Sequence, residues 1–316
     1  MLKKILSDIS ALHGDKLREY LISAFSRFGQ VGSDALGNLF FEIPGKNGGS
    51  VLVEAHRDEV GFIVREKLDN GFYLLDTVGT LDRRILPATR ILFETSSGII
   101  PAVITADPPH IDGEADSDIK AEAAGDAAAG DRGYYAAAPF EMKGGCFAGP
   151  GLDNKASVAV LFLLADRLSK QTCGHSVTFL LSNLEEVSQG GAAAFCRNKR
   201  FKAALVFDVS FAGAQRGKCG VSGNGPMIGC SPVLSDEFRK FLIKTAEKAD
   251  ILYQHEIMPG KTSTDADIIA VSGGGVRTAL ISTPVFNMHS CYEIVNSKDI
   301  ETAAELAFLS LHGDFI

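Results

Sequence analysis

The sequence carries no excess of positive charge. Its 316 residues include 31 Lys and Arg against 39 Asp and Glu, which gives a formal net charge of -8 at pH 7. A protein that binds nucleic acid or an anionic membrane surface usually presents a basic patch and a positive balance. The acidic balance therefore argues against nucleic acid and against a membrane as partners.

The sequence also lacks a long hydrophobic run. The longest uninterrupted apolar stretch, Val158 to Ala165, falls far short of the roughly 20 residues that span a bilayer. At the N-terminus, the stretch from Met1 to Asp8 places charged residues inside an amphipathic pattern, without the apolar core or the cleavage site of a signal peptide. We therefore expect no membrane-spanning segment, and we interpret the N-terminus as a helix.

Closely paired cysteines are missing as well. A disulfide framework or a thiolate zinc site needs cysteines at short, regular spacings such as CxxC. The six cysteines are instead scattered along the chain at Cys146, Cys173, Cys196, Cys219, Cys230 and Cys291. This pattern is typical of reduced thiols in a cytoplasmic protein.

What the sequence does contain is an alternation of helix and strand patterns that is interrupted once. A length of 316 residues suits two domains. Predicted helices cover residues 3–13, 16–28, 154–170, 190–198, 235–249 and 297–312, and predicted strands cover residues 38–43, 50–55, 177–182, 204–207 and 278–281. Several of these strands are almost entirely apolar, which indicates a sheet covered on both faces.

Within the interruption, the sequence changes to short strand patterns without a convincing helix. Residues 71–76, 90–95 and 99–105 read as strands, with a hairpin turn at Ser96-Ser-Gly. Residues 113–138 are rich in Ala, Gly and Asp and read as a flexible loop. We predict an α/β fold in which residues 1–62 and 146–316 form a mixed sheet sandwiched by helices. Residues 63–145 form an inserted, small all-β domain of the barrel type.

Polar side chains with metal-binding capacity stand where apolar strands stop or a helix starts. Ala55-His-Arg-Asp-Glu, Phe207-Asp-Val-Ser and Asn287-Met-His-Ser follow strands, Glu185 and Glu186 follow the strand at 177–182, and Gly151-Leu-Asp-Asn-Lys opens a helix. Proteins of the α/β class build their sites at such strand ends. Two imidazoles and several carboxylates form a ligand set suited to two divalent metals.

Taken singly, the segments that contain His56 and Asp153 also have ordinary explanations. His56 and Asp58 face the same way on an extended strand, so Asp58 can accept the second ring N–H of His56. A surface histidine beside solvated acids is nevertheless the commoner case for this pattern alone. Asp153 precedes a long helix, where it can cap the helix or bridge two metals.

The adjacent glutamates are harder to explain without a site. At the end of a strand the chain turns, so Glu185 and Glu186 can both reach one cleft. One of them can then ligate a metal while the other works as a general base. For the pair in isolation, a solvated loop is about as good an explanation.

Two further residues complete the set. Asp208 ends an apolar strand, where it is either functional or turn-forming, and His289 is either a ligand or a hydrogen-bonded loop histidine. Glu59, Asp265 and Glu293 are borderline candidates. The remaining histidines read as structural or exposed: His13, His110, His175, His255 and His312.

In chain order, these motifs resemble those of the co-catalytic metallo-aminopeptidases of peptidase family forty-two, which includes tetrahedral, deblocking and glutamyl aminopeptidases. The family pattern Ala-His-x-Asp-Glu-x-Gly-Phe matches Ala55 to Phe62, and Leu-Asp-Asn-(Arg/Lys)-Ala matches Leu152 to Ala156. Glu-Glu-Val-Gly-x-x-Gly-Ala matches Glu185 to Ala192, with Ser188 at the first glycine, and Met-His-Ser-x-x-Glu matches Met288 to Glu293. The resemblance covers essentially the whole chain.

The resemblance implies a phosphorylase/hydrolase-like fold and an enzyme that removes N-terminal residues from short peptides. It assigns one divalent metal to His56, Asp153 and Asp208 and a second to Asp153, Glu186 and His289. Glu185 becomes the general base, Asp58 orients His56, and the peptide bond between Asp153 and Asn154 is expected to be cis. The insert is expected to mediate self-association into dimers and a hollow dodecamer. Zinc, cobalt and manganese all fit such ligands, and the sequence does not choose among them.

Three alternatives stay open at this point. A related di-metal dipeptidase, carboxypeptidase or deacylase has a similar ligand order, although those families usually place their extra domain after the ligand pair rather than between His56 and Asp153. A glycosidase needs only two carboxylates, which leaves both histidines without a role. An inactive metal-binding scaffold does not explain the intact Glu185.

Overall fold

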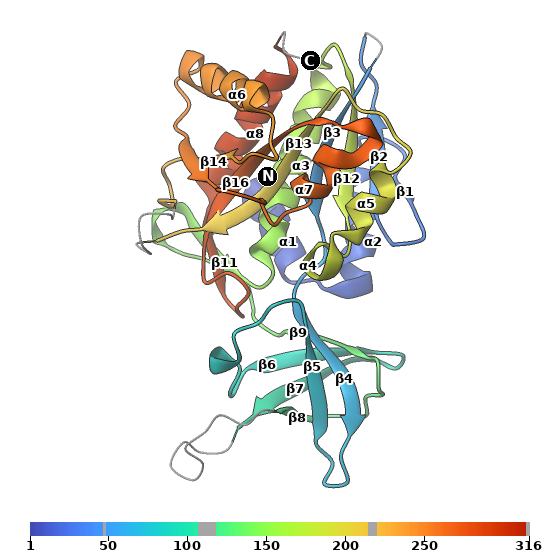
Figure 1. Ribbon diagram of the computed structural model, residues 1–316. Helices are drawn as coiled ribbons and strands as arrows, with labels where there is room; N and C mark the ends of the chain where they lie inside the picture. Colours follow the sequence, from blue (N-terminus) through green and yellow to red (C-terminus); the bar gives the residue numbers. More distant parts are fainter. Residues whose placement is uncertain (47–48, 107–117, 214–219, 314–316) are drawn as a thin grey trace.

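The computed structural model describes residues 1–46, 49–106, 118–213 and 220–313, and it divides them into an α/β body and a β-barrel (Figure 1). The barrel lies at one end of the body, joined to it by the segments that precede β4 and follow β9. This is the α/β fold with a barrel-like insert that the sequence predicts. No helix among these residues is long and apolar enough to cross a membrane.

The body is built on a mixed sheet of eleven strands, whose main order is β1-β2-β12-β3-β13-β16-β17-β11-β10. Four neighbouring strands at its centre are parallel: β12 (Ser176–Ser182), β3 (Ser50–His56), β13 (Ala203–Phe211) and β16 (Arg277–Phe286). The other members are β1 (Gly32–Ser33), β2 (Leu39–Ile43), β10 (Phe140–Glu141), β11 (Cys146–Gly149), β14 (Met227–Cys230), β15 (Gln254–Ile257) and β17 (Glu293–Asn296). The parallel centre brings the carboxyl ends of distant segments to one edge.

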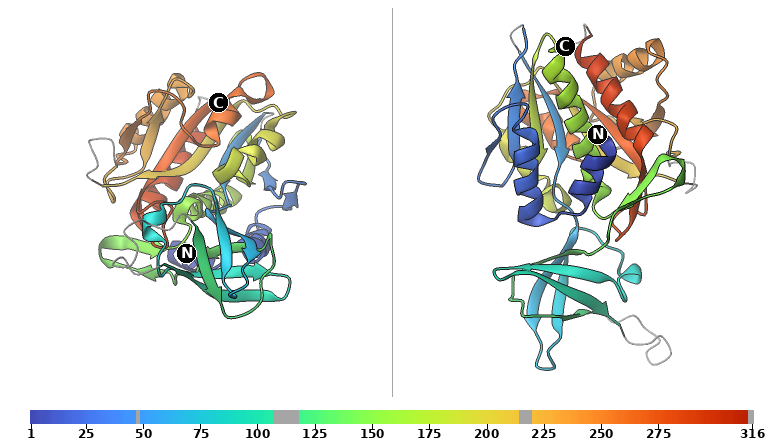
Figure 2. Two further views of the ribbon diagram at one scale, coloured as in Figure 1. Left: turned by 60° about the horizontal axis from the view of Figure 1, so that its bottom comes forward. Right: turned by 180° about the vertical axis from the view of Figure 1, so that it is seen from behind.

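Helices cover both faces of this sheet (Figures 1 and 2). The larger core lies between the sheet and α1 (Leu2–Ser10), α2 (Gly14–Phe25), α3 (Leu152–Lys170), α6 (Asp236–Lys248) and α8 (Ser297–Leu311). A smaller core on the other face is formed with α5 (Gly190–Cys196) and α7 (Ala266–Val271). Because both faces are covered, the central strands need apolar residues throughout, and Val51, Leu52 and Val53 are fully buried.

The barrel is closed by six strands in the order β4-β5-β8-β7-β6-β9. Their bounds are β4 (Gly61–Lys67), β5 (Tyr73–Val78), β6 (Arg90–Thr95), β7 (Gly98–Thr105), β8 (Ile119–Ala123) and β9 (Arg132–Tyr135). The barrel has its own core, with Phe62 and Phe93 fully buried inside it. The expected hairpin at Ser96-Ser-Gly is confirmed, because β6 and β7 pair in antiparallel register around it.

The expectation of a flexible loop over residues 113–138 is wrong for the part that the structure describes; residues 113–117 lie outside it. Strand β8 pairs with β5 and β7, and strand β9 pairs with β4 and β6. Ala and Gly have weak strand preferences, so the local sequence does not reveal these strands. Closure of the barrel stabilises them by giving each a partner on both edges. The small residue is needed at Gly133, where an added Cβ would stand 3.0 Å from the Cβ of Phe62.

Candidate active site

The candidate residues meet at the carboxyl edge of the parallel strands, on the side of the sheet that faces the barrel (Figure 1). His56 is the last residue of β3 and pairs in register with Ser182, the last residue of β12. Asp208 lies on the neighbouring strand β13. Side chains that are far apart in sequence therefore meet at one place, as expected for open parallel sheets.

Asp153 lies between the two histidines. Its Oδ1 atom is 3.2 Å from Nε2 of His56, and its Oδ2 atom is 3.2 Å from Nε2 of His289. The Asp153 side chain is thus directed at the two histidines rather than at the N-terminus of α3. Its peptide bond to Asn154 is cis, as the resemblance implies. Each oxygen of the carboxylate thus faces one imidazole, which is the arrangement that a bridging ligand needs.

The remaining carboxylates surround this centre. Asp208 Oδ1 and Glu185 Oε2 lie 3.7 Å and 4.0 Å from Nε2 of His56, and Glu186 Oε1 lies 3.4 Å from Nε2 of His289. The sequence pattern predicts both glutamates at the end of a strand. In the structure β12 ends at Ser182, and the glutamates open the one-turn helix α4 (Glu185–Ser188). This turn brings both side chains to the same side.

Both imidazoles present the same nitrogen to the carboxylates. Nδ1 of His56 lies 3.0 Å from the main-chain oxygen of Asp58, and Nδ1 of His289 lies 2.8 Å from the main-chain oxygen of Thr80. A carbonyl oxygen can only accept a hydrogen bond, so Nδ1 is the protonated nitrogen in each ring. Nε2 is therefore the atom left to bind a metal.

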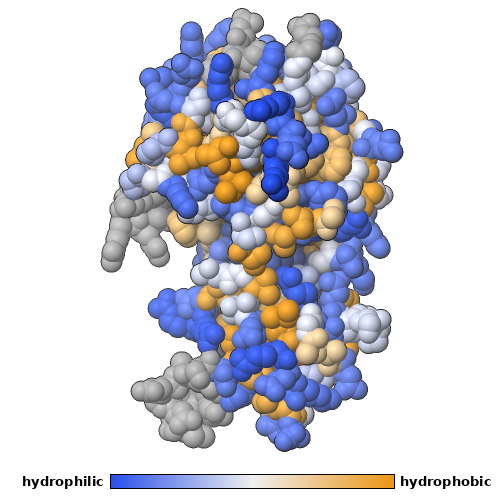
Figure 3. Space-filling view, turned by 45° about the vertical axis from the view of Figure 1, so that its right-hand side comes forward, coloured by the Kyte–Doolittle hydropathy of each residue, from blue (hydrophilic) through white to orange (hydrophobic). Residues whose placement is uncertain are grey.

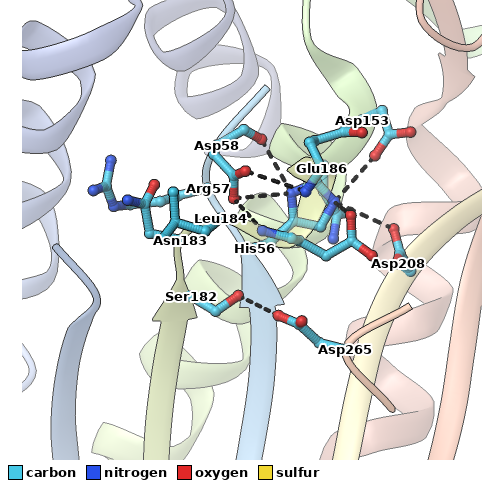
Figure 4. Close-up of polar contacts among 12 residues, drawn as sticks. His56, Arg57, Asp58, Asp153, Ser182, Asn183, Leu184, Glu186, Asp208 and Asp265 are labelled. Atoms are coloured by element: carbon cyan, nitrogen blue, oxygen red, sulfur yellow. Dashed lines mark hydrogen bonds and ion pairs between the residues drawn. The ribbon is translucent and has the colours of Figure 1, made fainter. Parts of the chain in front are cut away.

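The Asp58 side chain has a different contact from the one expected. Its carboxylate lies 3.7 Å from His56, too far for a hydrogen bond, and it accepts the main-chain N–H groups of Glu185 at 3.2 Å and Glu186 at 3.3 Å (Figure 4). Asp58 therefore orients His56 through its main chain and holds the two glutamates through its side chain.

The charges of the site are strongly coupled. Burial raises the pKa of the Glu185 carboxyl to about 9, with His56 opposing the rise and Asp208 adding to it. Burial lowers the pKa of His289, but its hydrogen bonds to Asp153 and Glu186 outweigh this and raise it to about 11. Such a cluster of carboxylates and imidazoles is stabilised when a divalent cation takes the place of the protons.

The donor set fits divalent metal ions. One ligand atom each from His56, Asp153 and Glu186 lie within 4.8 Å of one another. Oε1 of Glu186 is buried and meets Nε2 of His289 only at 3.4 Å, at the long limit of a hydrogen bond. A buried carboxylate oxygen in that state is costly unless it binds a cation. Oxygen and imidazole ligands together suit zinc, cobalt or manganese.

Glu293 is a supporting residue whose contacts the sequence did not specify. It is fully buried, and its carboxylate accepts the main-chain N–H of Asp153 at 2.7 Å and that of His289 at 2.6 Å. Its place in the Met-His-Ser-x-x-Glu pattern could have suggested such a role. The contact between the Thr80 carbonyl and His289 could not have been predicted from the sequence, because a main-chain contact does not depend on the identity of the side chain.

Below the site lies a second buried group. The Ser182 hydroxyl lies 2.7 Å from Oε1 of Glu54 and 2.6 Å from Oδ2 of Asp265, and Figure 4 draws its contact with Asp265. A hydroxyl has one proton, so Ser182 donates to one of these carboxyl groups at a time. Burial raises the pKa of the Asp265 carboxyl to about 6, against its hydrogen bond from Ser182. Through its contact with Ser182, Asp265 connects the start of helix α7 to the end of strand β12 beside the site.

A fold with a parallel sheet edge, an inserted barrel and this donor set defines a metal-dependent hydrolase. The family model described as M42 glutamyl aminopeptidase matches residues 37–306. The chain belongs to this family, and it is a hydrolase of the metallo-exopeptidase class with aminopeptidase relatives.

Individual proteins resemble this chain in sequence or structure over nearly its full length. The lysyl aminopeptidase of Pyrococcus furiosus is 28% identical over 300 residues, covering 88% of this chain and 85% of that protein. An aminopeptidase from the archaeon Desulfurococcus kamchatkensis has a similar structure, with a TM-score of 0.92 at 23% identity, covering 98% of this chain and 94% of that one. The TET1 peptidase of Pyrococcus horikoshii, described as assembling into a tetrahedron or a large octahedral shell, has a TM-score of 0.86 at 24% identity and covers 98% of both chains.

Proposed function

We propose that this chain is a two-metal aminopeptidase that removes N-terminal residues from short peptides. The observation that carries the proposal is the position of Asp153, whose two oxygens lie 3.2 Å from the free Nε2 atoms of His56 and His289. One ion would be held by His56, Asp153 and Asp208, and the other by Asp153, Glu186 and His289. When bound, such ions supply Lewis acidity and lower the pKa of water.

Glu185 is proposed as the general base. Its Oε2 atom lies 4.0 Å from Nε2 of His56, and its main-chain N–H is held by Asp58. From this position it takes a proton from the attacking water and returns it to the leaving amine when the peptide bond breaks.

One assay on three classes of substrate distinguishes this activity from its alternatives. Metal-loaded protein is assayed on aminoacyl anilides, on N-blocked peptides and on a soluble glucan. An aminopeptidase cleaves the first substrates and leaves blocked peptides intact. Cleavage of blocked peptides supports a deacylase or related peptidase, release of sugar supports a glycosidase, and no turnover on any substrate supports an inactive scaffold.

We also propose that the chain self-associates, with the barrel insert as the contact region. Between the first and last barrel strands, β4 and β9, three large apolar side chains are exposed among the described residues: Ile85 at 46%, Ile99 at 38% and Val103 at 43%. Figure 3 shows apolar surface on the barrel as well as on the body. The shells described for the P. horikoshii peptidase support assembly of this kind. Sedimentation of the purified chain tests the proposal; a strict monomer at micromolar concentration contradicts it, and a dimer alone contradicts the dodecamer.

A cytoplasmic location is part of the same proposal. It rests on the scattered cysteines, five of which are free thiols in the structure: Cys146, Cys173, Cys196, Cys230 and Cys291. Cys219 lies outside the described residues. Fractionation of the producing cells measures the location directly.

A further inference from the structure

One carboxylate ties together two segments of the site that are distant in sequence. Glu293 is 1% exposed, and each of its oxygens accepts one main-chain N–H, from Asp153 at 2.7 Å and from His289 at 2.6 Å. Both donors belong to residues that would hold the second ion. Because the two hydrogen bonds come from one rigid carboxylate, they set the separation between the two ligands.

A buried ion pair makes a second link to the Asp153 segment. Lys155 is 1% exposed, and its Nζ atom lies 3.0 Å from Oε2 of Glu59. The other oxygen of Glu59 is 2.8 Å from Nδ1 of His13. Glu59 directly follows Asp58, whose carbonyl orients His56. The pair thus joins the Asp153 segment to the His56 segment.

These two links tie the Asp153 segment to different parts of the site, one to His289 and the other to the segment that follows His56. We propose that Glu293 and the Lys155–Glu59 pair are positioning residues that act on different ions, an inference that rests on the proposed two-metal function. Glu293 sets the site formed by Asp153, Glu186 and His289. The Lys155–Glu59 pair sets the site formed by His56, Asp153 and Asp208. Both act through other residues rather than on substrate.

The chemistry of the side chains predicts separable effects. In Glu293→Gln, one acceptor oxygen is replaced by an amide NH₂ group, which opposes an N–H donor and spreads Asp153 from His289. In the double variant Glu59→Gln with Lys155→Met, the two charges of the pair are removed together, and the introduced amide can still hydrogen-bond the His13 ring. The link between the two segments is lost while the charge balance of the interior is preserved.

The test is stepwise cobalt(II) binding to metal-free protein, followed by the visible absorption of the bound ion. Glu186→Gln disables the site that includes His289, and Asp208→Asn disables the site that includes His56. The cobalt absorption that each variant retains is therefore the spectrum of its intact site. Asp299→Asn is the matched control, because Asp299 is fully buried on α8 and its carboxylate also accepts two main-chain N–H groups, from Gly223 at 2.7 Å and Gly225 at 2.8 Å. Thermal melting checks that each variant is folded at the assay temperature.

We expect Glu293→Gln to weaken the step that Glu186→Gln disables, and the double variant to weaken the step that Asp208→Asn disables. Partners that orient ligands typically change metal affinity by about 10–100-fold. Asp299→Asn should leave both affinities at the wild-type value. Glu293→Asp, which keeps the charge but shortens the reach, should weaken the same step as Glu293→Gln and serves if the amide variant does not fold.

Unchanged affinities in both variants overturn the inference, as does equal weakening of both steps in each of them. Loss of cobalt affinity in Asp299→Asn by the same factor overturns it too, because the effect is then one of general stability. Wild-type protein that binds fewer than two ions overturns the proposed function itself, and the inference falls with it. If the wild type binds two ions but the variants do not weaken the two binding steps selectively, the inference is overturned while the proposed function stands.

Discussion

Nδ1 of His289 lies 2.8 Å from the main-chain oxygen of Thr80, two residues beyond the barrel strand β5. His289 belongs to the body, whereas Thr80 lies in the connection between the barrel strands β5 and β6. The insert therefore fixes the tautomer of a histidine at the candidate metal centre. The barrel is part of the site, whatever else it contributes to assembly.

Removal of the general base should separate metal binding from turnover. Glu185→Gln keeps the shape of the side chain and removes its basic oxygen. We expect it to retain both ions and to lower kcat by about 10²–10⁴, the usual contribution of general base catalysis. Metal content measured by mass spectrometry, together with kcat on an aminoacyl anilide, checks this. Turnover near the wild-type value would show that another group is the base.

Metal removal should abolish activity reversibly. A chelator strips the ions that the His56, Asp153 and His289 cluster would hold, and activity should return when zinc, cobalt or manganese is added back. Saturation at two ions per chain is expected by calorimetry. In Glu186→Gln the ion proposed at His56, Asp153 and Asp208 should stay, while the ion at Asp153 and His289 should bind more weakly. Full activity with a single ion at saturation is incompatible with a two-metal mechanism.

Glu59 should make the stability of the protein depend on pH in the acid range. Burial raises the pKa of its carboxyl, but the charges of His13 and Lys155 outweigh this and lower it to about 2. A carboxyl whose pKa is lower in the folded state stabilises the protein above its ordinary pKa, near 4.5, and loses that contribution as the pH falls toward 2. The shift corresponds to at most about 3 kcal/mol.

The measurement is urea unfolding of metal-free protein between pH 6 and pH 3. The free energy of unfolding of the wild type should fall more steeply with decreasing pH than that of Glu59→Gln, which has no carboxyl to protonate at that position. Parallel curves for the two proteins would show that Glu59 does not carry this dependence.

Gly151 should be intolerant of a side chain for a reason beyond its backbone angle. Its φ is +62°, and an added Cβ would stand 2.4 Å from Oε2 of Glu59 and 2.9 Å from Nζ of Lys155. Gly71 is the matched control, with φ of +87° and nothing within 4 Å of an added Cβ. Both alanine variants strain the left-handed backbone by about 1 kcal/mol. Gly151→Ala should lose clearly more free energy of unfolding than Gly71→Ala, and equal losses would mean that the buried pair moves aside.

The elements of the body follow closely from local sequence. The helix predicted at 235–249 is α6, with Ser235 accepting the N–H of Phe238 as its N-cap, and the apolar strand at 177–182 lies within β12. Periodicity and capping are local properties, so they can be read from neighbouring residues. The strands β8 and β9 were missed because their stability comes from barrel partners distant in sequence.

For the candidate site, the sequence by itself determined which chemical groups are available. His56, Asp153, Glu186 and His289 stand where strands end or helices begin, and these positions follow from patterns along the chain. Their mutual geometry was decided only by the tertiary structure. The parallel register of β3, β12 and β13 brings the segments to one edge, and Glu293 and Thr80 set their separation and tautomer. These contacts join residues far apart in sequence and often involve main-chain atoms, which every residue shares, so no pattern of side chains can specify them.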